Sequence, residues 1–114
     1  MIYHYPGISH LQASFLCAGI CGRMFLPSSQ KENDEVWSIL ERKGLLGYEA
    51  AWIRISNSDN TGSWRDIENN ALVNFTNWAN KEPKSYHSRA YTASDRKWYS
   101  SYGDSRKNII CELP

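Results

Sequence analysis

The stretch Ala51-Trp52-Ile53-Arg54-Ile55 is a short run of apolar and β-branched residues in the middle of the chain. Such a run favours a strand. It ends in Ser56-Asn57-Ser58-Asp59-Asn60-Thr61-Gly62, where serine, asparagine and glycine are typical of turns. The pattern therefore predicts a strand over residues 51–55 that ends in a polar turn.

Two helices are predicted before this strand. The first is capped by Ser9, whose hydroxyl can accept an unpaired backbone N–H, and it ends near Gly19 or Gly22. The second begins where Ser29 and Glu32 have the spacing of a capping box. Its apolar residues recur at helical spacing and are followed by a glycine that can stop the helix: Val36, Trp37, Leu40 and Gly44.

The region after the turn has no sustained periodicity but is rich in aromatic residues. Residues 63–103 contain Trp64, Phe75, Trp78, Tyr86, Tyr91, Trp98, Tyr99 and Tyr102. Disordered segments are usually poor in aromatic residues, so we expect a long loop held in place by these rings. The apolar run at residues 108–111 predicts a closing strand. Two early helices followed by strands and long loops indicate the α+β class.

Length and charge limit the function. A chain of 114 residues fits one domain, which we place at residues 1–114. The formal net charge of +1 argues against a dedicated nucleic-acid binder, although residues 81–114 hold seven of the 13 basic and only four of the 12 acidic side chains. No apolar run approaches the roughly 18 residues needed to cross a membrane, so we expect no membrane insertion.

No catalytic motif is recognisable in the sequence. The three histidines have no context that suggests a Ser/His/Asp or Cys/His arrangement, and there is neither a glycine-rich phosphate loop nor an H-E-x-x-H helix. The three cysteines lack zinc-ligand spacing, and one long-range disulfide with one leftover thiol is their natural count. We therefore expect a protein that is not an enzyme.

Five fragments occur in a specific order along the chain. They are Ala13-x3-Cys17, Trp52-Ile53-Arg54-Ile55, Phe75-Thr76-Asn77-Trp78, Glu82-Pro83 and Ile110-Cys111-Glu112. In this order they resemble the A-x3-C helix, the WIGL strand, the y-x-n-W element, the following E-P pair and the closing i-C-e of the C-type lectin-like domains. Arg54 stands where WIGL has glycine. The resemblance covers residues 3–113 and implies two helices and two small antiparallel sheets with a long loop region.

The resemblance also implies a disulfide between Cys17 and Cys111, from the first helix to the last strand. The family's inner disulfide is missing, because its two positions resemble Arg89 and Gly103. Cys21 then has no partner within the chain, and two interpretations stay open. It is either a reactive or intermolecular thiol that links a homodimer, or a capped, half-buried cysteine.

Sugar-binding members of the family hold Ca²⁺ with an E-P-N or Q-P-D triplet, a later glutamate and a W-N-D triplet. Here the first triplet reads Glu82-Pro83-Lys84, and lysine has no acceptor atom. The late triplet reads Trp98-Tyr99-Ser100, without its asparagine and aspartate. Since Ca²⁺ needs six to eight oxygen ligands, the departures from the family pattern imply no calcium at the sugar site, and we expect no cofactor.

Six side chains of the loop region remain as candidates for ligand binding: Glu82, Lys84, Tyr86, His87, Arg89 and Tyr99. Tyrosine and arginine carry much of the binding energy at protein interfaces. We expect an extracellular, calcium-independent recognition module that binds a protein or an anionic glycan through residues 81–102. The competing interpretation is an aromatic-rich loop that packs on itself after losing its metal.

Two other functions stay open at this point. One is a structural, matrix or dimerising domain without a sugar site, and the other is a calcium-dependent carbohydrate-binding lectin with an atypical site. The resemblance implies a secreted protein or the extracellular part of a membrane protein. In that case the sequon Asn74-Phe75-Thr76 can carry a glycan.

Overall fold

The computed structural model describes residues 2–20, 22–42, 50–57 and 63–113. The helices are α1 (His10–Gly19) and α2 (Gln30–Arg42). The strands are β1 (Ile2–Ile8), β2 (Arg23–Met24), β3 (Ala50–Ser56), β4 (Arg65–Asp66), β5 (Arg89–Ala93), β6 (Trp98–Ser101) and β7 (Lys107–Glu112). The predicted α+β class and both predicted helices are confirmed.

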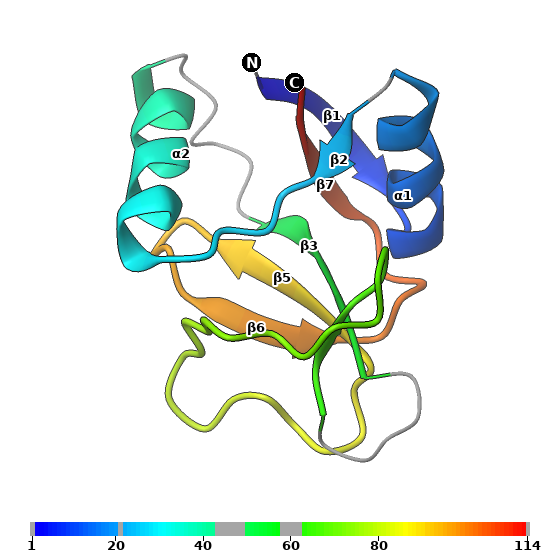
Figure 1. Cartoon of the computed structure of the whole chain (residues 1–114), viewed down its shortest axis with the longest axis vertical. Coiled ribbons are helices and arrows are strands. Elements are labelled where there is room, and N and C mark those ends of the chain that lie inside the picture. Colours follow the sequence, from blue (N-terminus) through cyan, green and yellow to red (C-terminus); the bar gives the residue numbers. More distant parts are fainter. Residues whose placement is uncertain (1, 21, 43–49, 58–62, 114) are drawn as a thin grey trace.

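The strands form one mixed sheet in the order β1-β7-β3-β5-β6, with β2 beside β7 and β4 beside β3. We expected two small antiparallel sheets. The two antiparallel parts exist, but a parallel contact between Ala51 in β3 and Asn108 in β7 joins them into one sheet. Ile2 at the start of β1 pairs with Glu112 at the end of β7, and the long loop between β4 and β5 lies at the opposite end of the molecule (Figure 1).

Side chains cap both helices as their sequences predict, with one difference. At α1, the Ser9 hydroxyl accepts the N–H of Gln12 (3.2 Å), and the Gln12 side chain accepts the N–H of Ser9 (3.1 Å). At α2, the Ser29 hydroxyl accepts the N–H of Glu32 (3.1 Å). The Glu32 carboxylate reaches back one residue further than predicted, to the N–H of Ser28 (3.3 Å). Gly44, the predicted stop, lies outside the described residues.

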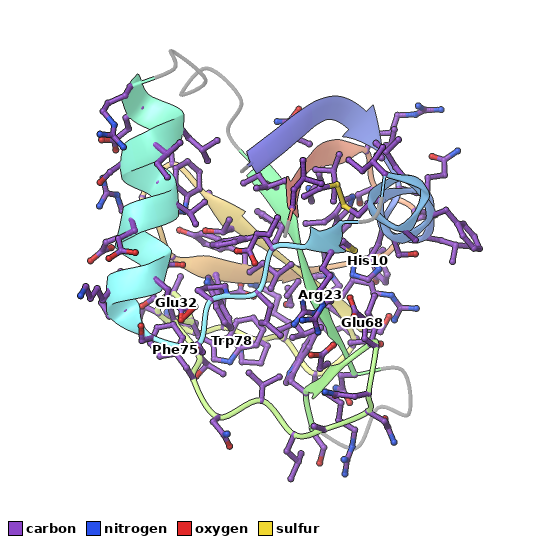
Figure 2. All side chains as sticks on the ribbon, turned by 45° about the horizontal axis from the view of Figure 1, so that its top comes forward. His10, Arg23, Glu32, Glu68, Phe75 and Trp78 are labelled. Atoms are coloured by element: carbon purple, nitrogen blue, oxygen red, sulfur yellow. A yellow bond between two sulfur atoms is a disulfide. The ribbon has the colours of Figure 1, made fainter. Side chains whose placement is uncertain are left out.

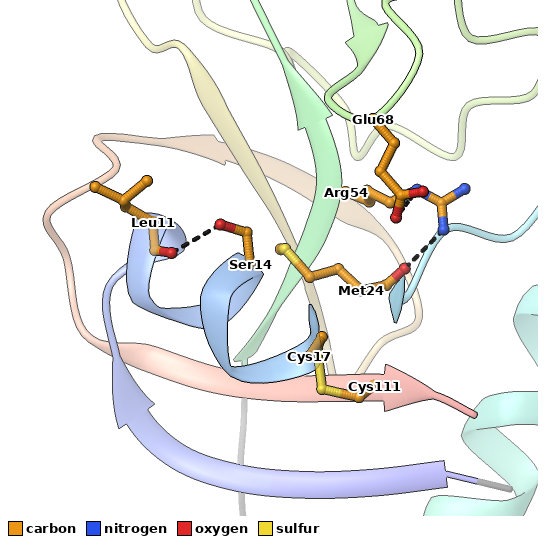
Figure 3. Close-up of a disulfide and its surroundings, with 7 residues drawn as sticks. All are labelled: Leu11, Ser14, Cys17, Met24, Arg54, Glu68 and Cys111. Atoms are coloured by element: carbon orange, nitrogen blue, oxygen red, sulfur yellow. Dashed lines mark hydrogen bonds and ion pairs between the residues drawn. A yellow bond between two sulfur atoms is a disulfide. The ribbon is translucent and has the colours of Figure 1, made fainter. Parts of the chain in front are cut away.

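The disulfide between Cys17 and Cys111 is present and joins α1 to β7 (Figure 3). Its Cα atoms are 5.4 Å apart, and the bridge spans 94 residues of sequence. Ala13 and Cys17 both face the sheet, where they pack with Met24, Trp52 and Ile109. The covalent link therefore lies inside the hydrophobic core, which shields it from solvent.

Aromatic rings anchor the long loop to the sheet, as the sequence predicts. Trp98 of β6 is fully buried and meets Phe75 and Trp78 edge-to-face, with ring centroids 5.7 and 5.9 Å away. Phe75 and Trp78 lie together beneath the start of α2 (Figure 2). Trp64 also packs on Trp78, with centroids 5.0 Å apart. Ring packing replaces regular secondary structure in this region.

His10 is buried at the start of α1, which no pattern in the sequence predicted. Its side chain is 3% exposed, lies edge-on to Trp52, and bonds through Nε2 to the carbonyl oxygen of Ile53 at 3.0 Å. Because a carbonyl only accepts, Nε2 carries the proton. Burial lowers the pKa of His10 to about 4, helped by nearby Arg89 and opposed by the bond to Ile53.

Acidification is expected to destabilise the fold through His10. The pKa in the unfolded chain is 6.5, above the folded value of about 4, so the unfolded chain binds the proton first as the pH falls. The contribution of neutral His10 to the free energy of unfolding is fully present above pH 6.5 and decreases toward pH 4. The loss is about 2 kcal/mol by pH 5. Urea unfolding at pH 7.5 and pH 5 measures this loss.

The control is His10→Gln, whose amide can donate the same bond but does not titrate. Subtracting the pH dependence of H10Q from that of wild type removes the contribution of carboxylates that titrate in the same pH range. An equal pH dependence in wild type and H10Q would show that His10 does not cause the loss.

Candidate functional site

The candidate site is formed where residues 82–87 of the long loop pack against the edge strand β6. Glu82 begins it, and the Glu82–Pro83 peptide bond is cis, as the resemblance allows. The Glu82 side chain is only 5% exposed. Its Oε1 accepts both the backbone N–H and the hydroxyl of Ser100, each at 2.8 Å. Oε2 accepts a hydrogen bond from the Lys84 ammonium.

Ser100 is the centre of this hydrogen-bond network. Its hydroxyl donates to Glu82 and accepts the N–H of Lys84 at 2.9 Å. Nδ1 of His87 lies 3.0 Å from the same oxygen. Since the hydroxyl proton is already directed at the carboxylate, His87 donates from Nδ1. The Ser100 hydroxyl thereby makes one donated and two accepted bonds, so its hydrogen-bonding capacity is fully used.

These contacts are not a catalytic triad. In a triad the histidine lies between the serine and the carboxylate and takes the serine proton. Here Ser100 lies between His87 and Glu82, is buried, and gives its proton to Glu82. The network fixes the loop, and it does not activate a nucleophile.

The charges at Glu82 balance within the protein. Burial would raise the pKa of Glu82, but the hydrogen bonds from Lys84 and Ser100 outweigh burial and lower it. The hydrogen bond between Lys84 and Glu82 also raises the pKa of Lys84. Both groups are therefore charged at neutral pH, and the Lys84 ammonium neutralises the carboxylate.

The residues around Glu82 do not fit a calcium ion. Both oxygens of its carboxylate already accept bonds from protein donors, and one donor is a cation. Ser100 and Tyr99 stand where the late aspartate and asparagine ligands would be required. Within the described residues, no three His, Cys, Asp or Glu side chains are grouped closely enough to hold a metal ion. A site for Ca²⁺ needs six to eight oxygens.

Tyr86, His87 and Tyr102 form an aromatic cluster on the surface beside this network. The His87 ring lies between the two tyrosines, with centroids 4.5 Å from Tyr86 and 4.6 Å from Tyr102. Tyr86 is 61% exposed and Tyr102 is 55% exposed. The sequence predicted Tyr86 and His87 but missed Tyr102, which follows the end of β6. Tyr102 lies close to His87 because β6 pairs with β5, and this pairing could not be predicted from the sequence.

Tyr99 lies on the other face of β6 from Ser100, since successive residues of a strand alternate. It stacks on Tyr91 of β5 with centroids 5.5 Å apart, and the Lys107 ammonium lies 4.1 Å from the centre of the Tyr91 ring. Tyr99 donates a hydrogen bond to Asp95, which raises the pKa of Tyr99 to about 12. Tyr99 is therefore committed to partners within the protein.

Arg89 also departs from the predicted loop surface. It begins β5, and its guanidinium donates to the Ser56 hydroxyl (2.8 Å) and the Ser88 carbonyl (3.1 Å). A Cβ atom on Gly103 would lie 3.1 Å from the Arg89 side chain. Arg89 and Gly103 are thus neighbours, as expected for the two positions of the lost inner disulfide. The six predicted residues therefore separate into Glu82, Lys84, Tyr86 and His87 on one side and Arg89 and Tyr99 on the other.

Two further sites predicted from the sequence have different outcomes. Asn74, the sequon asparagine, is exposed, and the half-buried Phe75 beside it packs against the core. The position is therefore accessible to a glycan. Cys21, the proposed intermolecular thiol, lies outside the described residues.

The family model of the lectin C-type domain matches residues 8–113. The chain belongs to this family. C-type lectin domains are recognition domains, which agrees with the absence of a catalytic arrangement at Ser100. Domains of this family are typically extracellular, and the buried disulfide is consistent with an oxidising compartment. None of the helices in the described residues is long and apolar enough to cross a membrane.

Several solved structures share the fold of this domain at low sequence identity. The carbohydrate-recognition domain of the mouse scavenger receptor C-type lectin is 18% identical, with a TM-score of 0.82 and coverage of 99% of this chain and 90% of that chain. Human lithostathine is 18% identical, with a TM-score of 0.86 and coverage of 98% and 81%. A calcium-independent type II antifreeze protein is 17% identical, with a TM-score of 0.81 and coverage of 96% and 82%. No curated protein matches the sequence.

Proposed function

We propose that this C-type lectin domain is a calcium-independent recognition module that binds an extracellular protein or glycan through its loop surface. We define the loop surface by the exposed side chains of Lys84, Tyr86 and Tyr102 and the half-buried ring of His87. The observation that carries the proposal is the ion pair between Lys84 and Glu82. In it, an ammonium of the protein occupies the side of the carboxylate that a metal ion would need.

The ion pair supports binding without a metal because it keeps the loop ordered. In a calcium-dependent site the ion both organises the loop and contacts the ligand. Here Lys84, Ser100 and His87 hold the loop by hydrogen bonds within the protein. A surface that is already ordered loses less conformational entropy on binding. A loop surface held in this way does not need calcium to bind a ligand.

The composition of the loop surface supports a binding role over self-packing. Tyr86 and Tyr102 expose more than half of their side chains, although the core nearby accepts rings as large as Trp78 and Trp98. Tyrosine offers a large rigid contact area with a polar end, which suits it to interfaces. The calcium-independent antifreeze protein provides a precedent for this fold without the metal.

The first arm of the test measures calcium dependence. Thermal unfolding with 5 mM Ca²⁺ and with EDTA should give the same Tm, within about 1 °C. An ion present at 100 times its Kd would add about 2.7 kcal/mol, which corresponds to about 10 °C for a domain of this size. A rise of that size would contradict the proposal.

The second arm tests the loop surface itself. Wild type and Tyr86→Ala/Tyr102→Ala are applied in EDTA to an array of neutral, sialylated and sulfated glycans and to an array of purified extracellular proteins. We expect ligands that wild type binds to lose about tenfold in affinity for the variant. The matched control is Leu11→Ala/Phe15→Ala, because both residues are exposed on α1. Binding that survives Y86A/Y102A but is lost in the control would place the ligand elsewhere.

A further inference from the structure

Two arginines flank Ser56 at the end of the central strand β3. Ser56 pairs with Arg65 of β4 on one side and with Arg89 of β5 on the other. Residues directly opposite one another in adjacent antiparallel strands have their side chains on the same face of the sheet. Neighbouring strands are about 4.8 Å apart, so the two arginine Cα atoms are separated by about 10 Å. Arg65, Ser56 and Arg89 therefore form a row across three strands.

This row lines a pocket of about 490 Å³. We call it the arginine pocket, and its polar lining consists of Ser56, Ser63, Arg65, Asp66, Asn70 and Arg89. It is distinct from the loop surface, whose residues are absent from this lining. The proposal below therefore stands independently of the proposed function.

The electrostatic balance of the described lining of the arginine pocket is positive. The one acidic side chain in this described lining, Asp66, accepts hydrogen bonds from Arg54 at both carboxylate oxygens (3.1 Å each), so its charge is neutralised outside the pocket. No carboxylate in the described residues lies within 4.0 Å of Arg65 or Arg89. Burial lowers the pKa of Arg89, yet a guanidinium stays charged at neutral pH. Two cations thus face one cavity without an acidic partner from the described chain.

Both guanidinium groups keep unused donors. Arg65 donates from one terminal nitrogen to the carbonyl of Asn70 (3.0 Å), and Arg89 donates from one terminal nitrogen to Ser56 and Ser88. Among the described contacts, the second terminal nitrogen and Nε of each remain. These donors form a fork that matches two oxygens of an anion. Each arginine can therefore bind an anion without giving up its existing bonds.

We propose that the arginine pocket binds a tetrahedral oxyanion, a sulfate or phosphate group. Such a group has enough oxygens to meet two forks that approach from different strands. A planar carboxylate has only two oxygens and can meet only one fork in the bidentate manner. The hydroxyls of Ser56 and Ser63 can supply further donors. The group can be a free ion or a substituent of a larger molecule such as a sulfated sugar.

The test follows backbone amide and arginine Nε signals by NMR during titration at constant ionic strength. The probes are sodium sulfate, sodium phosphate, sodium acetate, and a sulfated disaccharide with its unsulfated counterpart. We expect saturable shifts at Ser56, Ser63 and Asn70 with the tetrahedral ions. Acetate and the unsulfated disaccharide should give none. Tighter binding of the sulfated disaccharide than of sulfate would identify the sugar as the source, and equal binding would identify the free ion.

Charge variants decide whether the arginines are responsible. Arg65→Gln and Arg89→Gln should each weaken binding about tenfold, since each removes charge-assisted hydrogen bonds. If loss of the contact to Ser56 unfolds R89Q, R65Q by itself still tests whether an arginine of the pocket binds the ion. The control Arg42→Gln removes the same charge from the exposed end of α2 and should bind as wild type does. Unsaturable shifts, or binding that R65Q leaves unchanged, would overturn the proposal. Y86A/Y102A should bind the ions normally, which separates this proposal from the proposed function.

Discussion

Removal of the Cys17–Cys111 disulfide is expected to lower the free energy of unfolding by about 4–5 kcal/mol. The bridge joins two cysteines that lie 94 residues apart in the sequence, so it restricts the unfolded chain strongly. In Cys17→Ala/Cys111→Ala this restriction is lost while the small buried side chains change little in volume. The corresponding fall in Tm is about 15–20 °C. Urea and thermal unfolding of the variant and of wild type measure the difference.

The matched control for this experiment is Cys21→Ser. It removes the third cysteine and the exchange reactions that this thiol could start, and it leaves the bridge intact. We expect its stability to stay within about 0.5 kcal/mol of wild type. A double alanine variant that is no less stable than C21S would show that the fold does not depend on the bridge.

The sequence predicted those elements whose local signals agree with their packing. Ser9 and Ser29 cap helices, and residues 51–55 form a strand whose side chains are all buried. β5 was not predicted, because its inward-facing residues are Ala90 and Thr92, which do not produce an alternating apolar pattern. Its position depends on pairing with β3 and β6, which are remote in sequence.

The candidate site also depends on contacts between segments that are remote in sequence, which the sequence alone does not predict. Comparison with the family pattern predicted that Lys84 would disrupt the calcium triplet, and Lys84 does bond to Glu82. It did not predict that Ser100 would join Glu82, Lys84 and His87, because this requires β6 to lie beside residues 82–87. Arg89 was predicted as part of the loop surface. The register of β5 places it beside Ser56 instead, in the arginine pocket.

Arg54 explains how the domain tolerates an arginine where the family strand has glycine. Arg54 is 8% exposed, and its side chain extends from β3 to partners in β2 and β4. Its guanidinium makes a fork with both oxygens of Asp66. The remaining terminal nitrogen donates to the carbonyl of Met24 at 3.1 Å (Figure 3). All three nitrogens of Arg54 therefore have partners, which is the condition for burying a charge.

Asp66→Ala is expected to destabilise the domain by about 3–5 kcal/mol, because it leaves the Arg54 charge buried without its main partner. Glu68 is the nearest substitute, with a carboxylate oxygen 3.8 Å from Nε of Arg54. If Glu68 compensates, Asp66→Ala/Glu68→Gln should be less stable than the single variant by more than E68Q alone explains. Urea unfolding of the four proteins gives this coupling.

A second cycle separates the effect of burying a charge from that of losing a contact. Arg54→Met keeps much of the side-chain length without the charge. Arg54→Met/Asp66→Ala should therefore be more stable than Asp66→Ala, since removal of both partners of a buried pair is often tolerated where removal of one is not. Equal instability of these two variants would mean that Asp66 stabilises the turn at Glu68, whose N–H it accepts at 2.9 Å, rather than the buried cation. The order of stability thus shows which partner of Asp66 the fold requires.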